Sequence, residues 1–163
     1  MIIIPKNLHV LSIHNELISV KELPTFDSVF YGKSLVIDDT ATFPFTWSGC
    51  EIITNENTEG LKTFINIEFG DIYLTIPTHM KVLTLKNNKP IWRSAASLNS
   101  TDLVSVFIFH SLITTLNPTK ITTLDEDIDE VTCIGTRGNK PMFLGKKDSR
   151  YKNYNLSLVT LPT

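Results

Sequence analysis

Several features that would specify a specialised protein are absent or rare in this sequence. Its 163 residues contain only two cysteines, Cys50 and Cys133, which lie too far apart to suggest a disulfide framework. Neither belongs to a Cys-x-x-Cys or Cys/His cluster, and the four histidines have no metal-ligand spacing. We therefore expect two buried or half-buried thiols, no metal and no cofactor.

Long apolar runs and a strong net charge are also missing. The formal net charge is −2, which gives no bulk attraction to nucleic acid or lipid. No apolar run approaches the roughly 20 residues of a membrane span. The apolar start, MIIIP, lacks the basic leader of a signal peptide and predicts a first strand instead. We expect a cytoplasmic protein with no membrane partner, located in the host cytoplasm or the virion if its source is viral.

Strand-forming residues dominate what is present, since Thr, Ile, Val and Phe are frequent. Apolar and polar residues alternate in several segments, and turn signals separate them. The alternating segments are 17–23, 63–69, 71–76 and 82–85, and the turn signals are Tyr31-Gly32-Lys33, 55–60, Phe69-Gly70-Asp71 and 87–90. This pattern predicts a single all-β domain over residues 1–163, with a hairpin around Gly70-Asp71.

Three other segments have weaker patterns. Residues 103–116 are rich in Val, Ile, Phe and Thr, and they fit either a strand or a capped helix. The acidic segment 124–131 predicts a solvated loop or strand edge. Gly, Lys, Asn and Tyr are frequent in 135–155, which predicts long loops near the end of the chain.

Two stretches of the chain share one pattern, at about residues 9–30 and 81–107. Val-Leu-Ser-Ile at 10–13 matches Val-Leu-Thr-Leu at 82–85, and both stretches later carry Leu-x-x-x-Asp-x-Val. The second match is offset by three more residues than the first, and a loop at 87–90 accommodates this insertion. The pattern predicts a strand-turn-strand unit used twice, in which Leu23 and Leu98 face the core and Asp27 and Asp102 fix the following turns.

The repeat and its surroundings resemble the Hint module, the fold shared by inteins and the hedgehog autoprocessing domain. VLSIHNELISVKELPTFDSV follows the order of that family's first block, and GDIYLTIPTHMKVLTLKNNKPIWRSAASLNSTDLVSV follows its next block, including His79, Trp92 and Asp102. The resemblance covers about residues 5–107. It implies an all-β, pseudo-two-fold disk or horseshoe with little helix, built by internal duplication.

Three departures from the family pattern concern its chemistry. The family's thiol or hydroxyl nucleophile would lie near Ile3, but MIIIPK contains no Cys, Ser or Thr. The Thr-x-x-His motif is damaged, because either Thr75 and His79 are one residue too far apart or Ile76 stands in the place of the Thr. The last residues, 159–163, lack the family's C-terminal His-Asn. We therefore expect no autoprocessing, and Thr75 and His79 would be vestigial.

The stretch 146–155 mixes basic and aromatic residues, a combination that can hold a phosphate backbone and stack on bases. Its candidate binding residues are Lys146, Lys147, Arg150, Tyr151, Lys152 and Tyr154. The same residue types also favour contacts with proteins, and such a stretch is most commonly a solvated loop without a binding role.

Three functions follow as hypotheses. The first is a non-catalytic Hint-like protein that binds a protein partner, as a viral accessory or virion component, since its Ile, Thr, Asn and Lys usage is typical of AT-rich genomes such as those of many viruses. The second is a divergent autoprocessing enzyme that uses His79 with either Cys50 or Thr75. The third is a nucleic-acid or host-factor binder that acts through residues 146–155.

Overall fold

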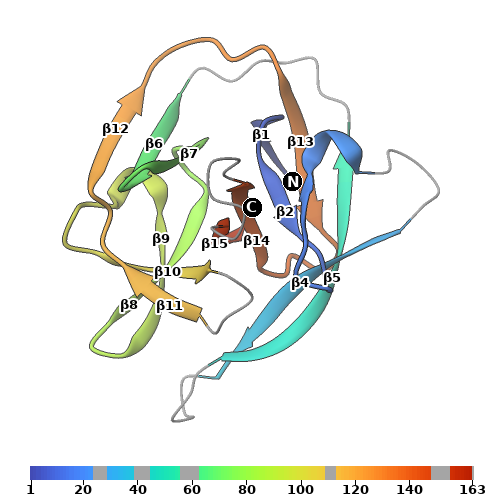
Figure 1. Cartoon of the computed structure of the whole chain (residues 1–163), viewed down its shortest axis with the longest axis horizontal. Coiled ribbons are helices and arrows are strands. Elements are labelled where there is room, and N and C mark those ends of the chain that lie inside the picture. The colour runs from blue at the N-terminus through green and yellow to red at the C-terminus, as the bar shows by residue number, and fades with distance from the viewer. Residues whose placement is uncertain (24–28, 39–44, 56–62, 109–112, 148–154, 163) are drawn as a thin grey trace.

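The computed structural model describes residues 1–23, 29–38, 45–55, 63–108, 113–147 and 155–162 (Figure 1). Its strands form three sheets in which every pairing is antiparallel. The first sheet has the spatial order β1 (Ile2–Pro5), β13 (Val131–Thr136), β5 (Phe45–Asn55) and β4 (Phe30–Ile37). The third sheet has the order β12 (Lys120–Leu124), β6 (Phe64–Phe69) and β7 (Ile72–Pro77).

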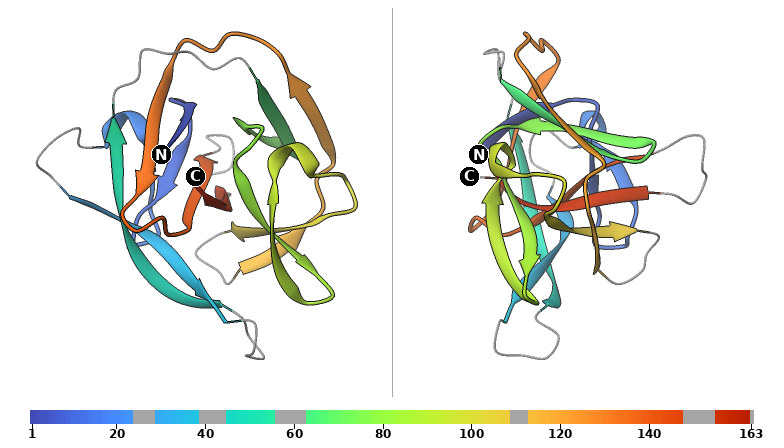
Figure 2. Two further views of the ribbon diagram at one scale, coloured as in Figure 1. Left: turned by 180° about the vertical axis from the view of Figure 1, so that it is seen from behind. Right: turned by 90° about the vertical axis from the view of Figure 1, so that its left-hand side faces the viewer.

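The second sheet crosses the middle of the molecule. Its order is β11 (Ile113–Leu116), β10 (Leu103–Ile108), β8 (Lys81–Lys86), β15 (Asn155–Leu161), β14 (Met142–Lys147), β2 (His9–Leu11) and β3 (Leu17–Ser19), and β9 (Lys89–Ser94) pairs with β8. Two short 3₁₀ helices, η1 (Val20–Glu22) and η2 (Ala95–Ser97), are the helical elements of the described residues. The first and third sheets curl around the β14–β15 hairpin, and the two ends of the chain lie side by side in all views (Figures 1 and 2). The all-β fold with little helix expected from the sequence is confirmed.

The two repeated stretches have the same local geometry. In each, a strand-turn-strand unit runs into a 3₁₀ helix, at β2–β3–η1 and at β8–β9–η2. Leu23 ends η1 with its N–H bonded to the Val20 carbonyl, and Leu98 ends η2 with its N–H bonded to the Ala95 carbonyl. Both leucines are buried, and Asp102 accepts the Asn99 N–H at 2.8 Å, which fixes the following turn as expected. Asp27 lies outside the described residues.

The equivalence extends one strand further toward the N-terminus. The Met80 N–H bonds to the Pro77 carbonyl after β7, and the Leu8 N–H bonds to the Pro5 carbonyl after β1. The last strand of the first half, β6, pairs with β7 of the second half. Likewise the last strand of the second half, β13, pairs with β1 of the first half. The pseudo-two-fold relation therefore includes an exchange of strands.

Two apolar clusters form the core. The larger one joins the inner faces of all three sheets and includes Ile4, Ile67, Leu74 and Ile134. The second cluster lies between the long β4–β5 hairpin and the second sheet, and it contains Leu11, Leu35, Phe45, Leu83, Phe107, Phe143 and Val159. Trp47 packs on its edge, with its ring centroid 5.6 Å from that of Phe107 and 5.8 Å from that of Phe143.

Two expectations from the sequence were wrong. Tyr31-Gly32-Lys33 is not a turn but lies inside β4, where Gly32 is required for close packing: a Cβ there would lie 2.4 Å from Ile52 Cδ1. The long loops expected over 135–155 are interrupted by β14, which is buried along Met142–Gly145, while 148–154 lie outside the described residues. In both places Gly and polar residues suggested a turn or loop. The strand forms because it pairs with strands that are distant in the sequence, β5 for Gly32 and β2 for β14.

Other local expectations were correct. The segment 103–116, which fitted either a helix or a strand, forms β10 and β11. The hairpin around Gly70-Asp71 joins β6 to β7, and Asn87 and Asn88 turn the chain between β8 and β9 with φ of 53° and 61°. The acidic residues of 125–130 are exposed in the connection that precedes β13.

Candidate functional site

The position at which the Hint resemblance places its nucleophile lies on β1. Ile3 is half-buried there, and its Cα is paired with that of Cys133 on β13. The side chain at this position is therefore a hydrocarbon held in a sheet, and the nearest residue across the strand pair carries a thiol. Sequence reasoning missed Cys133, although the alternation in VTCIGT and MIII would have placed both residues on one face had the pairing been known.

Thr75 and His79 occupy β7 and the turn that follows it. The Thr75 hydroxyl donates to Asn66 Oδ1 at 3.1 Å, while His79 is exposed in the turn that leads into β8. No hydrogen bond of the described residues joins Thr75 to His79. Because Pro5 and Pro77 are equivalent in the two halves, Thr75 is the counterpart of Ile3, and the packing of β1 against β7 brings the two strands together.

The thiol of Cys50, a possible nucleophile in the second hypothesis, is unsuited to nucleophilic attack. Cys50 is buried in the main core, with Sγ 3.7 Å from the Gly32 carbonyl oxygen. Burial raises the pKa of the Cys50 thiol to about 11, so the thiol is protonated at neutral pH. Cys133 is half-buried and free, as expected for a thiol without a disulfide partner.

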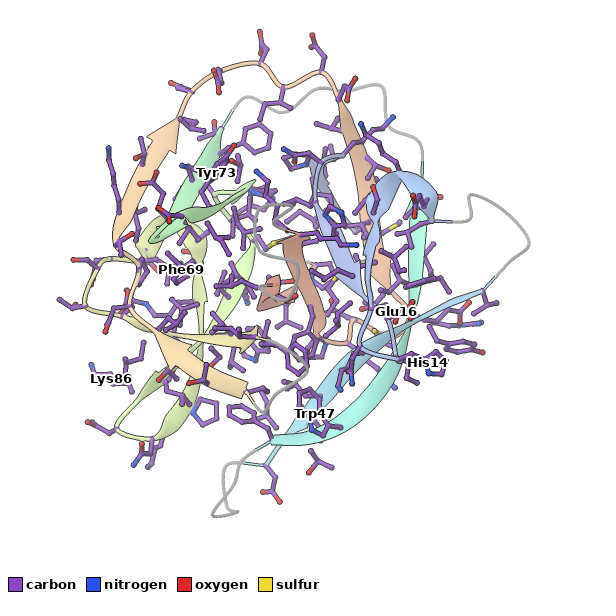
Figure 3. All side chains as sticks on the ribbon, in the orientation of Figure 1. His14, Glu16, Trp47, Phe69, Tyr73 and Lys86 are labelled. Carbon is purple, nitrogen blue, oxygen red and sulfur yellow. The ribbon has the colours of Figure 1, made fainter. Side chains whose placement is uncertain are left out.

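The basic and aromatic candidates are only partly in view. Lys146 and Lys147 end β14, whereas Arg150, Tyr151, Lys152 and Tyr154 lie outside the described residues. The Lys146 ammonium lies 3.8 Å from the centre of the Tyr73 ring, so it meets an aromatic side chain on β7 that sequence reasoning did not select. Figure 3 labels this tyrosine.

His9 lies next to this basic end of β14. It pairs with Gly145 in the β2–β14 register. Burial lowers the pKa of His9, the neighbouring Lys147 and Lys146 ammonium groups lower it further, and Glu22 acts in the opposite direction. The lowered pKa favours the neutral imidazole beside two cationic side chains.

A second lysine lies among aromatic rings at the other end of the molecule. The Lys33 ammonium is 4.0 Å from the centre of the Trp47 ring and donates a hydrogen bond to Asn15 Oδ1 in the β2–β3 turn. Burial lowers the pKa of Lys33. These contacts hold the β2–β3 turn against the β4–β5 hairpin. In Figure 3 this region lies near the labels of His14, Glu16 and Trp47.

An open depression of about 420 Å³ lies between the β8–β9 hairpin and the turn before β10. Its lining is mostly polar, and Arg93 and Asp102 within it form an ion pair. The Arg93 guanidinium also donates to the Ser97 carbonyl at 2.7 Å. These contacts pair Arg93 and Asp102 with groups of the second repeat, so they stabilise the turn before β10.

Metal-binding geometry and a membrane-spanning helix are both absent from the described residues. No group of three His, Cys, Asp or Glu side chains in the described ranges lies close enough to hold a metal ion. Across those same ranges, no helix has the length and apolar character needed to cross a membrane.

The chain is similar in structure to inteins along nearly its full length. The TvoVMA intein matches with a TM-score of 0.62 and 12% identity, over 99% of this chain and 97% of that one. A bacterial intein-like domain from Clostridium thermocellum matches with a TM-score of 0.63 and 9% identity, over 97% and 99%. The DnaB intein from Synechocystis matches with a TM-score of 0.60 and 12% identity, over 96% and 97%.

These likenesses establish the fold. No protein-family model matches the sequence, and a search of curated proteins found no match either. The chain therefore has the Hint fold of inteins, as the sequence resemblance implied.

Proposed function

We propose that this chain is a Hint-fold protein that performs no autoprocessing and acts by binding other proteins. The observation that carries the proposal is Ile3, whose hydrocarbon side chain occupies the position that the resemblance assigns to the nucleophile. Such a side chain has no atom that can form an ester or thioester with a peptide carbonyl. On a rigid β scaffold without this chemistry, function resides in the surface and its loops.

The other candidates for chemistry support the same conclusion. The Thr75 hydroxyl is engaged by Asn66, and among the described residues no hydrogen bond joins His79 to a hydroxyl or thiol. Cys50 is buried and protonated at neutral pH. A nucleophile without an adjacent base or a lowered pKa reacts slowly, so these residues do not form a working pair.

The proposal is tested by placing a folded fusion partner ahead of Met1 and measuring the intact mass after long incubation. We expect an uncleaved fusion, both with and without added thiol. Cleavage at the junction would contradict the proposal. Co-purification of a second polypeptide with the chain from its native source is the matching expectation for binding.

A divergent autoprocessing enzyme is the second candidate, and one observation favours it. Cys133 lies opposite Ile3 in the β1–β13 register and is the half-buried thiol of the described residues. If the fusion is cleaved, Cys133→Ala distinguishes the source of the chemistry. Loss of cleavage in this variant would establish an enzyme that attacks from β13, whereas Cys50→Ala serves as the matched control.

Nucleic-acid binding is the third candidate, favoured by Lys146 over the Tyr73 ring and by Lys147 beside it. Cations next to exposed aromatics suit a single-stranded backbone and its bases. A gel shift at low salt with wild type and with Lys146→Ala/Lys147→Ala tests it. The control removes the same charge from the exposed Lys86 and Lys89 at the β8–β9 turn. No shift at low salt would reject this candidate.

The finer proposal is that the chain is a viral accessory or virion protein. It rests on the Ile, Thr, Asn and Lys usage, which is typical of AT-rich genomes. Mass spectrometry of purified particles from the source tests it, because a virion component is enriched in particles and an unrelated protein is not.

A further inference from the structure

The sheet β1-β13-β5-β4 has one buried and one open face. Its inner face carries Ile2, Ile134 and Ile52, all in the main core. Because successive side chains of a strand point to opposite faces, the odd-numbered residues in 51–55 of β5 and 133–135 of β13 point outward, whereas Phe45 and Trp47 at the other end of β5 face the second apolar cluster. We call the opposite side the outer face of the first sheet.

This outer face is unusually apolar. It holds five of the ten exposed large hydrophobic side chains of the described residues. They are Met1 (53% exposed), Ile13 (46%), Val29 (52%), Tyr31 (57%) and Ile53 (39%).

These five side chains form one continuous patch. Met1 lies over Gly135, since a Cβ on that glycine would be 2.7 Å from Met1 Cγ. Gly135 is paired with Ile53. Phe30 on β4 is paired with Ile52, so Val29, one residue before Phe30, lies across from Ile53. Ile13 continues the patch, because its N–H bonds to the Tyr31 carbonyl at 3.2 Å.

Across β1, β13 and the end of β5, the pseudo-two-fold counterparts of this face are more polar. Met1, Gly135 and Ile53 correspond to Tyr73, Glu68 and Lys120, because both rows run across equivalent strands in the same registers. In the next row, Ile3, Cys133 and Asn55 correspond to Thr75, Asn66 and Thr122. The third sheet therefore shows that this fold accepts a charged side chain at the position of Ile53, so an apolar residue is not demanded there by folding.

The size of the patch matches one side of a stable interface. Exposed fractions of about half on residues of this size leave roughly 450 Å² of exposed surface, most of it apolar, within the range of about 300–600 Å² in which such patches are often functional. A standard interface buries about 800 Å² per partner, of which about 57% is apolar, which is again roughly 450 Å². The outer face thus supplies the apolar share of one partner.

We propose that the outer face of the first sheet binds the same face of a second copy of this chain in a two-fold dimer. Glu51 and Arg137 beside the patch suit self-association, since they form an ion pair at 3.2 Å and leave no net charge between them. Two copies related by a two-fold axis therefore meet without like-charge repulsion there. Twisted sheets of this kind pack face to face at about 10 Å. This proposal goes beyond the function proposed above and does not depend on it.

Sedimentation equilibrium of the untagged full chain tests the proposal. We expect a dimer between about 1 and 100 µM, a range that starts at the weak limit usual for interfaces of this size. Ile53→Lys copies onto the first sheet the lysine that its counterpart Lys120 already carries, so the variant is expected to fold. Each dimer then contains two lysines that must be desolvated, and we expect association to weaken by at least about a hundredfold.

Two further variants make the result decisive. Tyr31→Lys changes a more exposed residue of the same patch and is expected to give the same loss, with circular dichroism unchanged. Thr114→Lys adds the same charge at an exposed position of β11 and is expected to leave the dimer intact. A wild type that stays monomeric throughout would overturn the proposal, and so would a dimer that resists both Ile53→Lys and Tyr31→Lys. Neither outcome bears on cleavage of the fusion, so the two proposals fail separately.

Discussion

Gly145→Ala is expected to be among the most damaging small substitutions in the chain. Gly145 lies within β14, between β2 and β15. A Cβ there would lie 2.3 Å from the Leu156 carbonyl oxygen and 2.9 Å from Ser157 Cα. Both are backbone atoms of β15 in the middle of the molecule, so they cannot rotate away as the end of a side chain does.

The size of the effect follows from the shift that the added carbon requires. Carbon and carbonyl oxygen approach to about 3.3 Å even in close contacts, so the two strands must separate locally by about 1 Å. Overpacking of this kind costs about 1–3 kcal/mol. Each ladder hydrogen bond that is weakened adds about 1 kcal/mol. We expect a loss of about 3–4 kcal/mol in the free energy of unfolding, or about 6–16 °C in Tm for a chain of this size.

Urea unfolding followed by circular dichroism and tryptophan fluorescence measures this loss. The matched control is Gly135→Ala, where the added Cβ would meet Met1 Cγ at 2.7 Å, an exposed side chain that can move aside. We expect the control to cost less than about 1 kcal/mol. If both variants unfold at the same urea concentration as wild type, the tight approach of β14 to β15 is refuted.

Three other predictions concern single titratable or reactive side chains. His9 has a lowered pKa in the folded state, so the folded state binds fewer protons than the unfolded chain below about pH 6.5. The free energy of unfolding therefore falls as the pH drops through this range. In His9→Gln, the unfolding midpoints at pH 7.5 and pH 5 should lie closer together than in wild type. Lys33→Met should change the free energy of unfolding by less than about 1 kcal/mol, because the lost contact with Trp47 is offset by the removal of a partly buried ammonium group. A loss above about 2 kcal/mol in urea unfolding would contradict this balance. In native protein, a thiol reagent should label Cys133 first and leave Cys50 until unfolding, because Cys50 is buried with a pKa of about 11; peptide mapping after partial labelling decides the order.

Much of the fold was predictable because its signals are local. The hairpin at Gly70 and the turn at Asn87 each follow from a few adjacent residues. The buried Leu23 and Leu98 were found by comparing two stretches of the sequence with each other. By contrast, Gly32 was taken for a turn because the need for a missing Cβ comes from Ile52, across a strand pair that the sequence does not display.

The candidate site was less predictable because it depends on contacts between distant strands. The absence of a nucleophile at Ile3 is visible in the sequence, but the thiol opposite it is separated from it by most of the chain. Similarly, Lys146 was selected with aromatic residues that follow it, while its aromatic neighbour in the structure is Tyr73 on β7. Residue type alone identified the chemistry and could not identify the partner.

The exchange of strands between the two halves has a consequence for synthesis on the ribosome. Ile2 on β1 has its partner at Ile134 on β13, so the first strand made must wait for almost the last part of the chain. At about 5–20 residues per second, this delay amounts to roughly 7–26 s. During that interval the nascent N-terminal half presents an unpaired, apolar strand edge, which is the kind of surface that chaperones and neighbouring chains recognise.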